Sequence, residues 1–167
     1  MHRYLASVFL ALCCMSQVQA QTWYSFARSF SDTALYFFDV DSVGRQGDTV
    51  TVWIKYVGDP ISPDVDGSYA TAQRFSFECG KHTLHALSTI TYDKGGKPIR
   101  THPDTGRAQN VAAGSIGDSL FKAACAADFP KNPSHELYFP VLGNDVFRYT
   151  ESYFEHMRRS ETDHSPN

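Results

Sequence analysis

The residues with the most readily testable chemistry in this chain are its four cysteines. Cys13 and Cys14 lie in an apolar segment near the amino terminus, and Cys79 and Cys125 lie in the rest of the chain. Residues 1–20 have the layout of a cleaved signal peptide, so Cys79 and Cys125 would remain, and an even count in an exported protein predicts a disulfide bond between them. The alternatives are a metal pair and a redox pair, and the Cys-x-x-Cys motif that would favour either does not occur. A bond that closes a loop of about 46 residues would stabilise the fold by about 4 kcal/mol.

Three short groupings have residue types that bind metals. His82 and His85 would chelate a metal together only if a turn persisted through Thr83, since residues three apart on a strand face opposite sides. The Asp39–Asp41 and Asp64–Asp66 pairs lack the third ligand and the distal Glu of a calcium loop. Turn chemistry explains all three groupings, so we predict no metal site and no cofactor.

A catalytic signature is not evident in the sequence. Ser115 and Ser119 are not predicted to be nucleophiles, because neither lies in a Gly-x-Ser-x-Gly elbow. A pair of carboxylates brought together by the fold stays open as an acid/base site, because tertiary proximity cannot be seen in a sequence. We therefore expect a protein that is not an enzyme.

The first 20 residues have the layout of a signal peptide. Arg3 precedes an apolar stretch over residues 4–15, and Val18-Gln19-Ala20 supplies small residues for cleavage after Ala20. The stretch is too short to span a bilayer. A lipid anchor is not expected, because Leu12 precedes Cys13 and Cys13 precedes Cys14, where a small residue is needed. We predict an exported chain with a single domain over 21–160 and a disordered tail over 161–167.

The charge of the exported part argues against nucleic acid as a partner. Residues 21–167 contain 18 Asp and Glu but 14 of the 15 Lys and Arg, so their net charge is −4. Nucleic-acid binding by phosphate neutralisation needs the opposite balance. No later apolar run approaches the length of a membrane-spanning helix.

Alternating side chains predict strands at about residues 49–57, 69–79 and 83–92, partial alternation predicts one at 23–30, and a run that is apolar on both faces predicts one at 33–40. The short connections between them favour an antiparallel sheet. The stretch 93–114 is rich in Gly and charge, and a loop this long is either mobile or functional. Ser115 is a plausible helix cap with Asp118 as a weak capping-box partner, and a second helix is expected over 144–159.

Two surfaces are candidates for binding a protein partner. The first is an outward face with Trp53, Lys55, Tyr36 and Phe38, unless the C-terminal helix covers it. The second is a basic loop with residues that could steer an acidic partner; they are Lys94, Lys97, Arg100 and Arg107. Solvated loop charge is the alternative for the second surface.

Three segments together resemble the surface-adhesin protein E family of proteobacterial exported proteins. They are residues 36–43 with 47–53, residues 75–79 through 87–88 to 92–93, and residues 113–115 leading to Leu120 and Cys125, with Ala113 where the family usually has Pro. The resemblance covers about residues 23–126. It implies an antiparallel sheet with helical packing and adhesion to host extracellular-matrix or serum proteins, and the typical member is lipid-anchored.

The sequence therefore predicts an α+β fold, with a curled antiparallel sheet of about five strands, helices packed on one face and one disulfide. The function expected first is an exported, non-enzymatic module that binds an extracellular or envelope protein, with a homodimer through a sheet edge as a further form of association. A periplasmic structural or assembly protein is the second hypothesis, and a small hydrolase or metal-dependent enzyme is the third. The mature protein is expected in the periplasm or at the cell surface.

Overall fold

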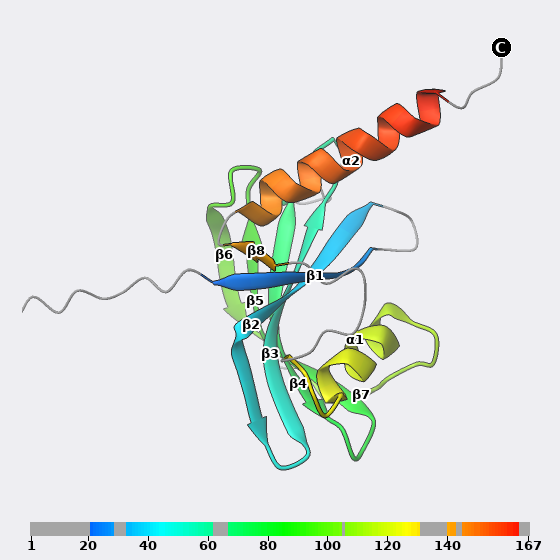
Figure 1. Ribbon diagram of the computed structural model, residues 1–167. Helices are drawn as coiled ribbons and strands as arrows, with labels where there is room; N and C mark the ends of the chain where they lie inside the picture. The colour runs from blue at the N-terminus through cyan, green and yellow to red at the C-terminus, as the bar shows by residue number, and fades with distance from the viewer. Residues whose placement is uncertain are drawn as a thin grey trace, which may run out of the picture.

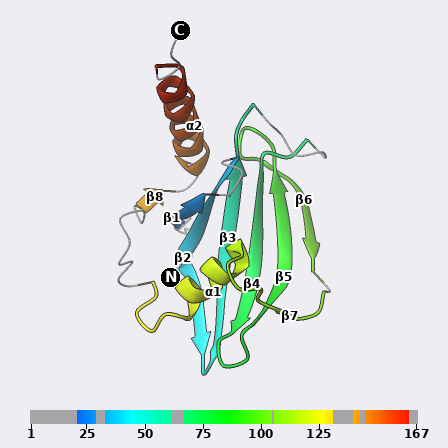
Figure 2. The same cartoon turned by 90° about the vertical axis from the view of Figure 1, so that its right-hand side faces the viewer.

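The computed structural model describes residues 21–28, 33–61, 67–104, 106–130, 140–142 and 145–163, and these form one antiparallel sheet with two helices (Figures 1 and 2). The strands are β1 (Thr22–Arg28), β2 (Ala34–Gln46), β3 (Thr49–Gly58), β4 (Ala70–Glu78), β5 (Thr83–Tyr92), β6 (Pro98–Pro103), β7 (Gln109–Asn110) and β8 (Pro140–Leu142). The helices are α1 (Ile116–Cys125) and α2 (Asp145–Asp163). The expected signal peptide lies outside the described residues. Helix α2 continues to Asp163, inside the stretch 161–167 that was expected to be a disordered tail.

The strands follow the order β6-β5-β4-β3-β2-β1-β8, and β7 pairs with β5 beside β6. Neighbouring strands are antiparallel throughout, as the short connections predicted. The β2–β3 turn uses Gly47 at a φ of 57°, a conformation that L side chains rarely adopt. The α+β class is confirmed, and the sheet formed by the described residues has eight strands where about five were expected.

Two of the additional strands lie in the stretch 93–114, which was expected to be a structureless loop. β6 and β7 both pair with β5, and their side chains are exposed. Hydrophobic periodicity is a signal of side-chain burial, so it fails for strands that are held by backbone pairing alone. The stretch is therefore a sheet edge that presents its side chains to solvent.

Each face of the sheet carries its own hydrophobic cluster and its own helix. Phe37 and Phe38 are both fully buried, and as consecutive strand residues they point to opposite faces. Phe38 packs in the cluster that contains Leu120 and Phe121 of α1. Phe37 packs in the cluster that contains Phe154 of α2. The two helices thus lie on opposite faces and not on one, because β2 is apolar on both of its sides.

Helix α1 begins where the sequence predicted. The Ser115 hydroxyl accepts a hydrogen bond from the Asp118 N–H at 3.1 Å, which satisfies one of the free amides of the first turn. The Asp118 carboxylate accepts from Gly114 N–H at 2.9 Å instead of from the cap residue itself. Neither described helix has the length and hydrophobicity that would let it cross a membrane.

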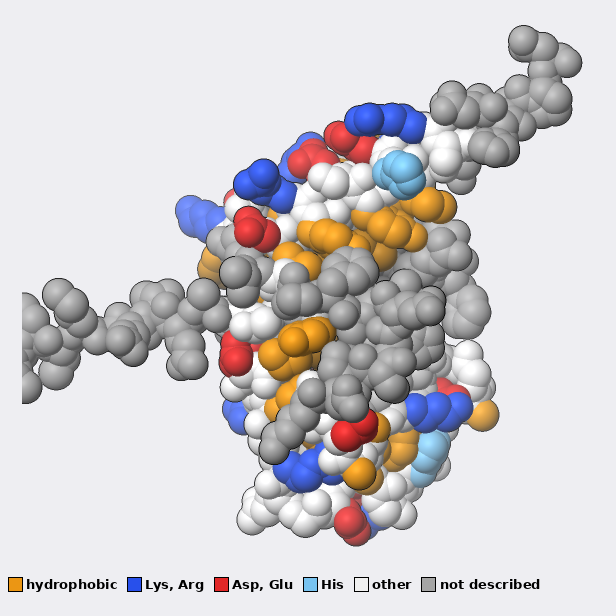
Figure 3. All heavy atoms as spheres, in the orientation of Figure 1, with side chains coloured by type: hydrophobic (Ala, Val, Ile, Leu, Met, Phe, Trp, Pro, Cys, Tyr) orange, Lys and Arg blue, Asp and Glu red, His pale blue; other side chains and the backbone are white. Residues whose placement is uncertain are grey.

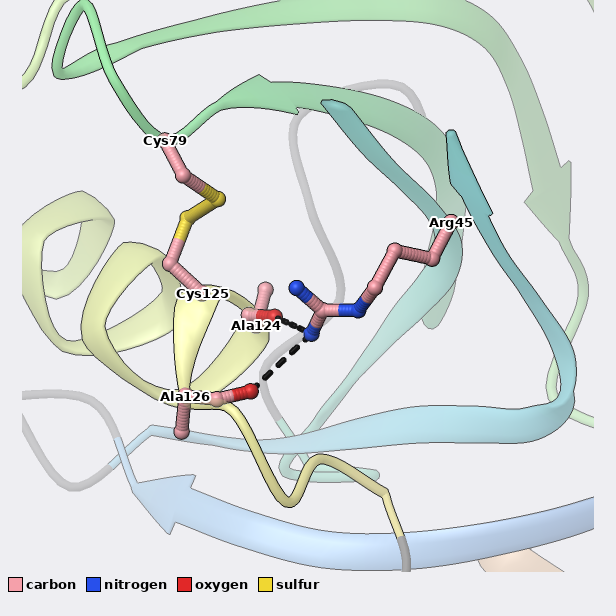
Figure 4. The surroundings of a disulfide bond; sticks show 5 residues. All are labelled: Arg45, Cys79, Ala124, Cys125 and Ala126. Atoms are coloured by element: carbon pink, nitrogen blue, oxygen red, sulfur yellow. Dashed lines mark hydrogen bonds between the residues drawn. A yellow bond between two sulfur atoms is a disulfide. The ribbon is translucent and has the colours of Figure 1, made fainter. Parts of the chain in front are cut away.

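A disulfide joins α1 to the sheet, as predicted from the cysteine count. Cys79 follows β4 and Cys125 ends α1, with their Cα atoms 5.7 Å apart (Figure 4). Beside the bond, the Arg45 guanidinium donates to the carbonyl oxygens of Ala124 and Ala126 at 3.2 and 2.9 Å. These carbonyls end α1, so β2 caps the helix with a positive charge.

Replacing Arg45 by alanine should lower the free energy of unfolding by about 1 to 2 kcal/mol, because the carbonyls at the end of α1 lose a charged donor. Urea denaturation followed by circular dichroism measures the change. Arg74→Ala is the matched control, since Arg74 is an exposed arginine of β4. Equal losses in the two variants would show that the contact with α1 contributes nothing.

Candidate functional site

The four residues expected to share one outward face are divided between the two faces of the sheet. The register pairs Phe38 with Ile54 and Tyr36 with Tyr56, so both aromatic residues lie on the α1 side. Trp53 and Lys55 alternate with Ile54 and Tyr56 and therefore lie on the α2 side. The expectation of one shared face is wrong, and Phe38 is fully buried. Trp53 and Tyr36 are half-buried.

Lys55 is a buried cation inside a cage of aromatic rings. Its side chain is only 2% exposed. Its Nζ lies 4.3 Å from the ring centre of Trp23, 4.6 Å from that of Tyr92 and 5.5 Å from that of Phe147. These rings come from β1, β5 and α2, so one lysine connects the two halves of the sheet to the helix. Cation–π contacts of this kind partly replace the water that a buried ammonium loses.

Burial lowers the pKa of Lys55 to about 8, and the negative charge of Asp39 raises it in opposition. Asp39 is itself 2% exposed. Burial raises the pKa of Asp39, while hydrogen bonds from the Asp41 and Ser42 backbone and the charge of Lys55 lower it. Phe147 of α2 lies over Lys55, and the burial of Lys55 closes it to a partner.

The basic loop that was predicted as a partner surface forms the exposed β5–β6 hairpin and the connection from β6 to β7, which together we call the basic hairpin. Lys94 and Lys97 lie in its turn, Arg100 lies on β6, and Arg107 lies between β6 and β7. All four side chains are exposed. Figure 2 shows this hairpin at one edge of the sheet, away from α1. The structure therefore leaves the predicted basic residues accessible, in contrast to Lys55.

Hydrogen bonds and packing hold the turn of this hairpin in one conformation. The Asp93 carboxylate accepts from the N–H groups of Gly95 and Lys97, both at 2.9 Å. Gly96 has a φ of 79° and packs against Phe147 of α2, whose ring would lie 2.8 Å from an added Cβ. Only glycine fits there, and the close approach fixes the turn against α2.

A cleft of about 290 Å³ opens where this turn meets α2. Its lining includes Val57, Pro60 and Tyr69 from the strand ends and Phe147 from α2. We call it the α2 cleft; its other lining residues are Gly58, Lys94, Gly95, Asp145, Arg148 and Glu151. It is the site to which the sequence-predicted Lys94 contributes.

Charged residues of both signs surround the α2 cleft. Asp145, Arg148 and Glu151 follow each other at three-residue intervals along α2, and Lys94 comes from the hairpin. No ion pair joins any of these four to another residue in the part of the chain that the structure describes. Figure 3 shows acidic and basic side chains alternating along the outer side of α2, with hydrophobic side chains below them. The charges are thus available to a ligand.

The other residues singled out for their chemistry lie apart from the cleft. His82 has a φ of 56° in the turn before β5, and its ring lies 4.3 Å from that of Phe121. His85 lies within β5, with a buried Nε2 that has no hydrogen-bond partner. Asp39 accepts from the Asp41 N–H beside an irregularity inside strand β2, where a turn was expected. The Asp64–Asp66 pair lies outside the described residues, among which no three His, Cys, Asp or Glu side chains gather as a metal site requires.

The comparisons with known proteins give one match. Residues 23–126 match the family model described as surface-adhesin protein E. The matched stretch runs from β1 to the end of α1 and contains both bonded cysteines and the basic hairpin, while α2 lies beyond it. No curated protein and no solved structure matches the chain.

Proposed function

The chain belongs to the surface-adhesin protein E family, and we propose that it is an exported, non-enzymatic module that binds extracellular-matrix or serum proteins of a host. The family match supports an adhesin-like surface protein. The exposed basic hairpin, on a chain with a net charge of −3, is the observation that supports a protein partner. In this proposal the signal peptide is cleaved after Ala20, so the mature chain begins at Gln21.

The hairpin is suited to steering because its charges are concentrated on one edge. Lys94, Lys97, Arg100 and Arg107 lie within two adjacent turns and one short strand. A local positive potential on an acidic protein attracts the acidic surface of a partner and orients the encounter. The proposed role of these residues is therefore to raise the rate of association.

Replacing Lys94, Lys97 and Arg107 by alanine should slow association with immobilised matrix proteins by about tenfold at low salt. Added salt should slow the wild type toward the same rate, because it screens exposed charges. Surface plasmon resonance measures both effects. The matched control removes the same number of positive charges elsewhere, with Arg74, Lys81 and Arg159 replaced by alanine. Equal slowing in the control would mean that net charge, and not the hairpin, sets the rate.

Protease added to intact cells separates this function from the second hypothesis. A surface adhesin should be cut, whereas a periplasmic structural or assembly protein should be protected by the outer membrane. Amino-terminal sequencing of the mature chain tests cleavage after Ala20. A chain that is protected from protease and binds no matrix protein would overturn the proposal.

A further inference from the structure

We propose that the α2 cleft binds an extended peptide segment of the partner that carries one acidic and one basic side chain. This inference rests on the proposed function, because it names the part of a protein partner that is recognised. The occupant is argued from the size of the cleft, from the charges at its rim and from the rigidity of its walls.

The size of the cleft favours side chains over a whole cofactor or drug-sized ligand. Its volume is about 290 Å³, which lies at the lower end of the range for small-molecule sites. The floor is apolar, with Val57, Pro60, Tyr69 and Phe147. A cleft of this size accommodates one or two side chains and the aliphatic stems that carry their charges.

The charges at the rim select a ligand that is itself of mixed charge. Lys94 and Arg148 supply positive charge, while Asp145 and Glu151 supply negative charge. A purely acidic or purely basic segment would meet repulsion from half of the rim, whereas a segment with both signs can satisfy both halves. Arg148 and Glu151 carry opposite charges and are about 4.5 Å apart along the helix axis. Side chains two positions apart on an extended peptide lie on one face about 7 Å apart, a spacing that long flexible side chains can bridge.

The walls of the cleft are held in place before a ligand arrives. Arg158 of α2 forms a salt bridge with Asp59 at 2.7 Å, which ties the segment after β3 to the helix. On the other side, Gly96 packs against Phe147 and Asp93 fixes the hairpin turn. A preformed site loses less entropy when it binds, so a small contact area can still give measurable affinity.

Gly95 offers a way to fill the cleft without changing its walls. It lines the cleft, its φ is outside the left-handed region, and an added Cβ would meet only the Asp93 Oδ1 at 3.4 Å. A Gly95→Trp substitution should therefore block the cleft in a folded protein. Thr101→Trp is the matched control, because Thr101 is exposed on β6 and does not line the cleft. Circular dichroism and the urea midpoint check that both variants are folded.

The probes are labelled Ser-Gly peptides that carry one Glu and one Lys with one residue between them, compared with peptides carrying Glu alone, Lys alone or neither. Fluorescence polarisation with the full chain should detect binding of the mixed-charge peptides only. Gly95→Trp should weaken that binding at least tenfold, and Thr101→Trp should leave it unchanged. Equal binding by Gly95→Trp, equal binding of singly charged peptides, or equal competition by free Glu and Lys would each overturn the inference.

The outcomes also separate this inference from the proposed function. If the chain binds matrix proteins and Gly95→Trp binds them equally well, the cleft is not the contact site while the proposed function stands. If the mixed-charge peptides bind and no matrix protein does, the cleft is a peptide site and the proposed function fails.

Discussion

A chain in which Cys79 and Cys125 are both replaced by alanine should lose about 4 kcal/mol of unfolding free energy, the largest effect expected from any change described for this protein. The bond closes a loop with a sequence separation of 46 residues. A cross-link across a loop of this length removes much of the conformational freedom of the unfolded chain. Since small domains are stable by only about 5 to 15 kcal/mol, the loss would remove a large share of the total.

Urea denaturation followed by circular dichroism measures this loss. With a urea m-value of about 2 kcal/mol/M, the midpoint should fall by about 2 M. The loss of stability should be concentrated in α1, because without the disulfide this helix is held to the sheet mainly by the packing of Leu120 and Phe121. Hydrogen exchange should therefore accelerate in α1 more than in α2, which has a separate cluster. An unchanged midpoint would mean that the bond does not restrict the unfolded chain.

The parts of the fold that the sequence predicted are those with a strong local signal. Val50, Val52 and Ile54 alternate along β3 and point into one cluster, as their spacing indicated. Ser115 caps α1, because a hydroxyl in front of an amphipathic stretch is a local signal too. The bonded cysteines followed from their number and from the expectation of export. None of these inferences needed knowledge of which strands are neighbours.

The division of residues between the two faces could not be predicted in the same way. β2 has buried hydrophobic residues at consecutive positions, Phe37 and Phe38, so its pattern does not tell which residues accompany Trp53 and Lys55. The register between β2 and β3 determines which residues of β2 share a face with Lys55, and it pairs Phe37 with Lys55. The register is set by cross-strand packing and by the irregularity between Asp39 and Gly44. Neither feature has a signature along one strand.

The α2 cleft was beyond prediction for a related reason. The sequence singled out Lys94 for its charge, and it predicted a helix over 144–159, in which Arg148 and Glu151 are exposed. What it could not show is that the hairpin turn packs on the first turns of α2 through Gly96 and Phe147. A glycine against an aromatic ring about 50 residues away is a contact between distant segments, and local patterns report only near neighbours.

Lys55→Met should abolish a rise of unfolding free energy with pH that the wild type shows between about pH 8 and 10. The pKa of Lys55 is about 8 in the folded chain and 10.5 when it is solvated. Below pH 8 the amine is charged in both states. Above pH 8 the folded state loses this proton first, so the unfolded state binds more protons and stability increases with pH. The difference between the two pKa values corresponds to about 3 kcal/mol.

The window closes near pH 10 because tyrosines act in the opposite direction. Burial raises the pKa of Tyr36, Tyr92 and Tyr149 above the ordinary value of 10.0. The unfolded chain then ionises these phenols first, and stability falls as the pH rises further. Measurements up to pH 9.5 stay below the range in which these phenols ionise, so the comparison of the wild type with Lys55→Met reports mainly on the amine.

Urea midpoints at pH 7 and pH 9.5 are sufficient to test the role of Lys55. The wild type should gain about 2 kcal/mol between the two values, while Lys55→Met should gain almost nothing. Lys97→Met serves as the matched control, because Lys97 is exposed and should keep the wild-type rise. If Lys55→Met retained the rise, the ammonium would be as well stabilised by Trp23, Tyr92 and Phe147 as by water. Cation–π contacts would then balance the cost of desolvation, and the contact of Lys55 with Phe147 of α2 would carry no net penalty.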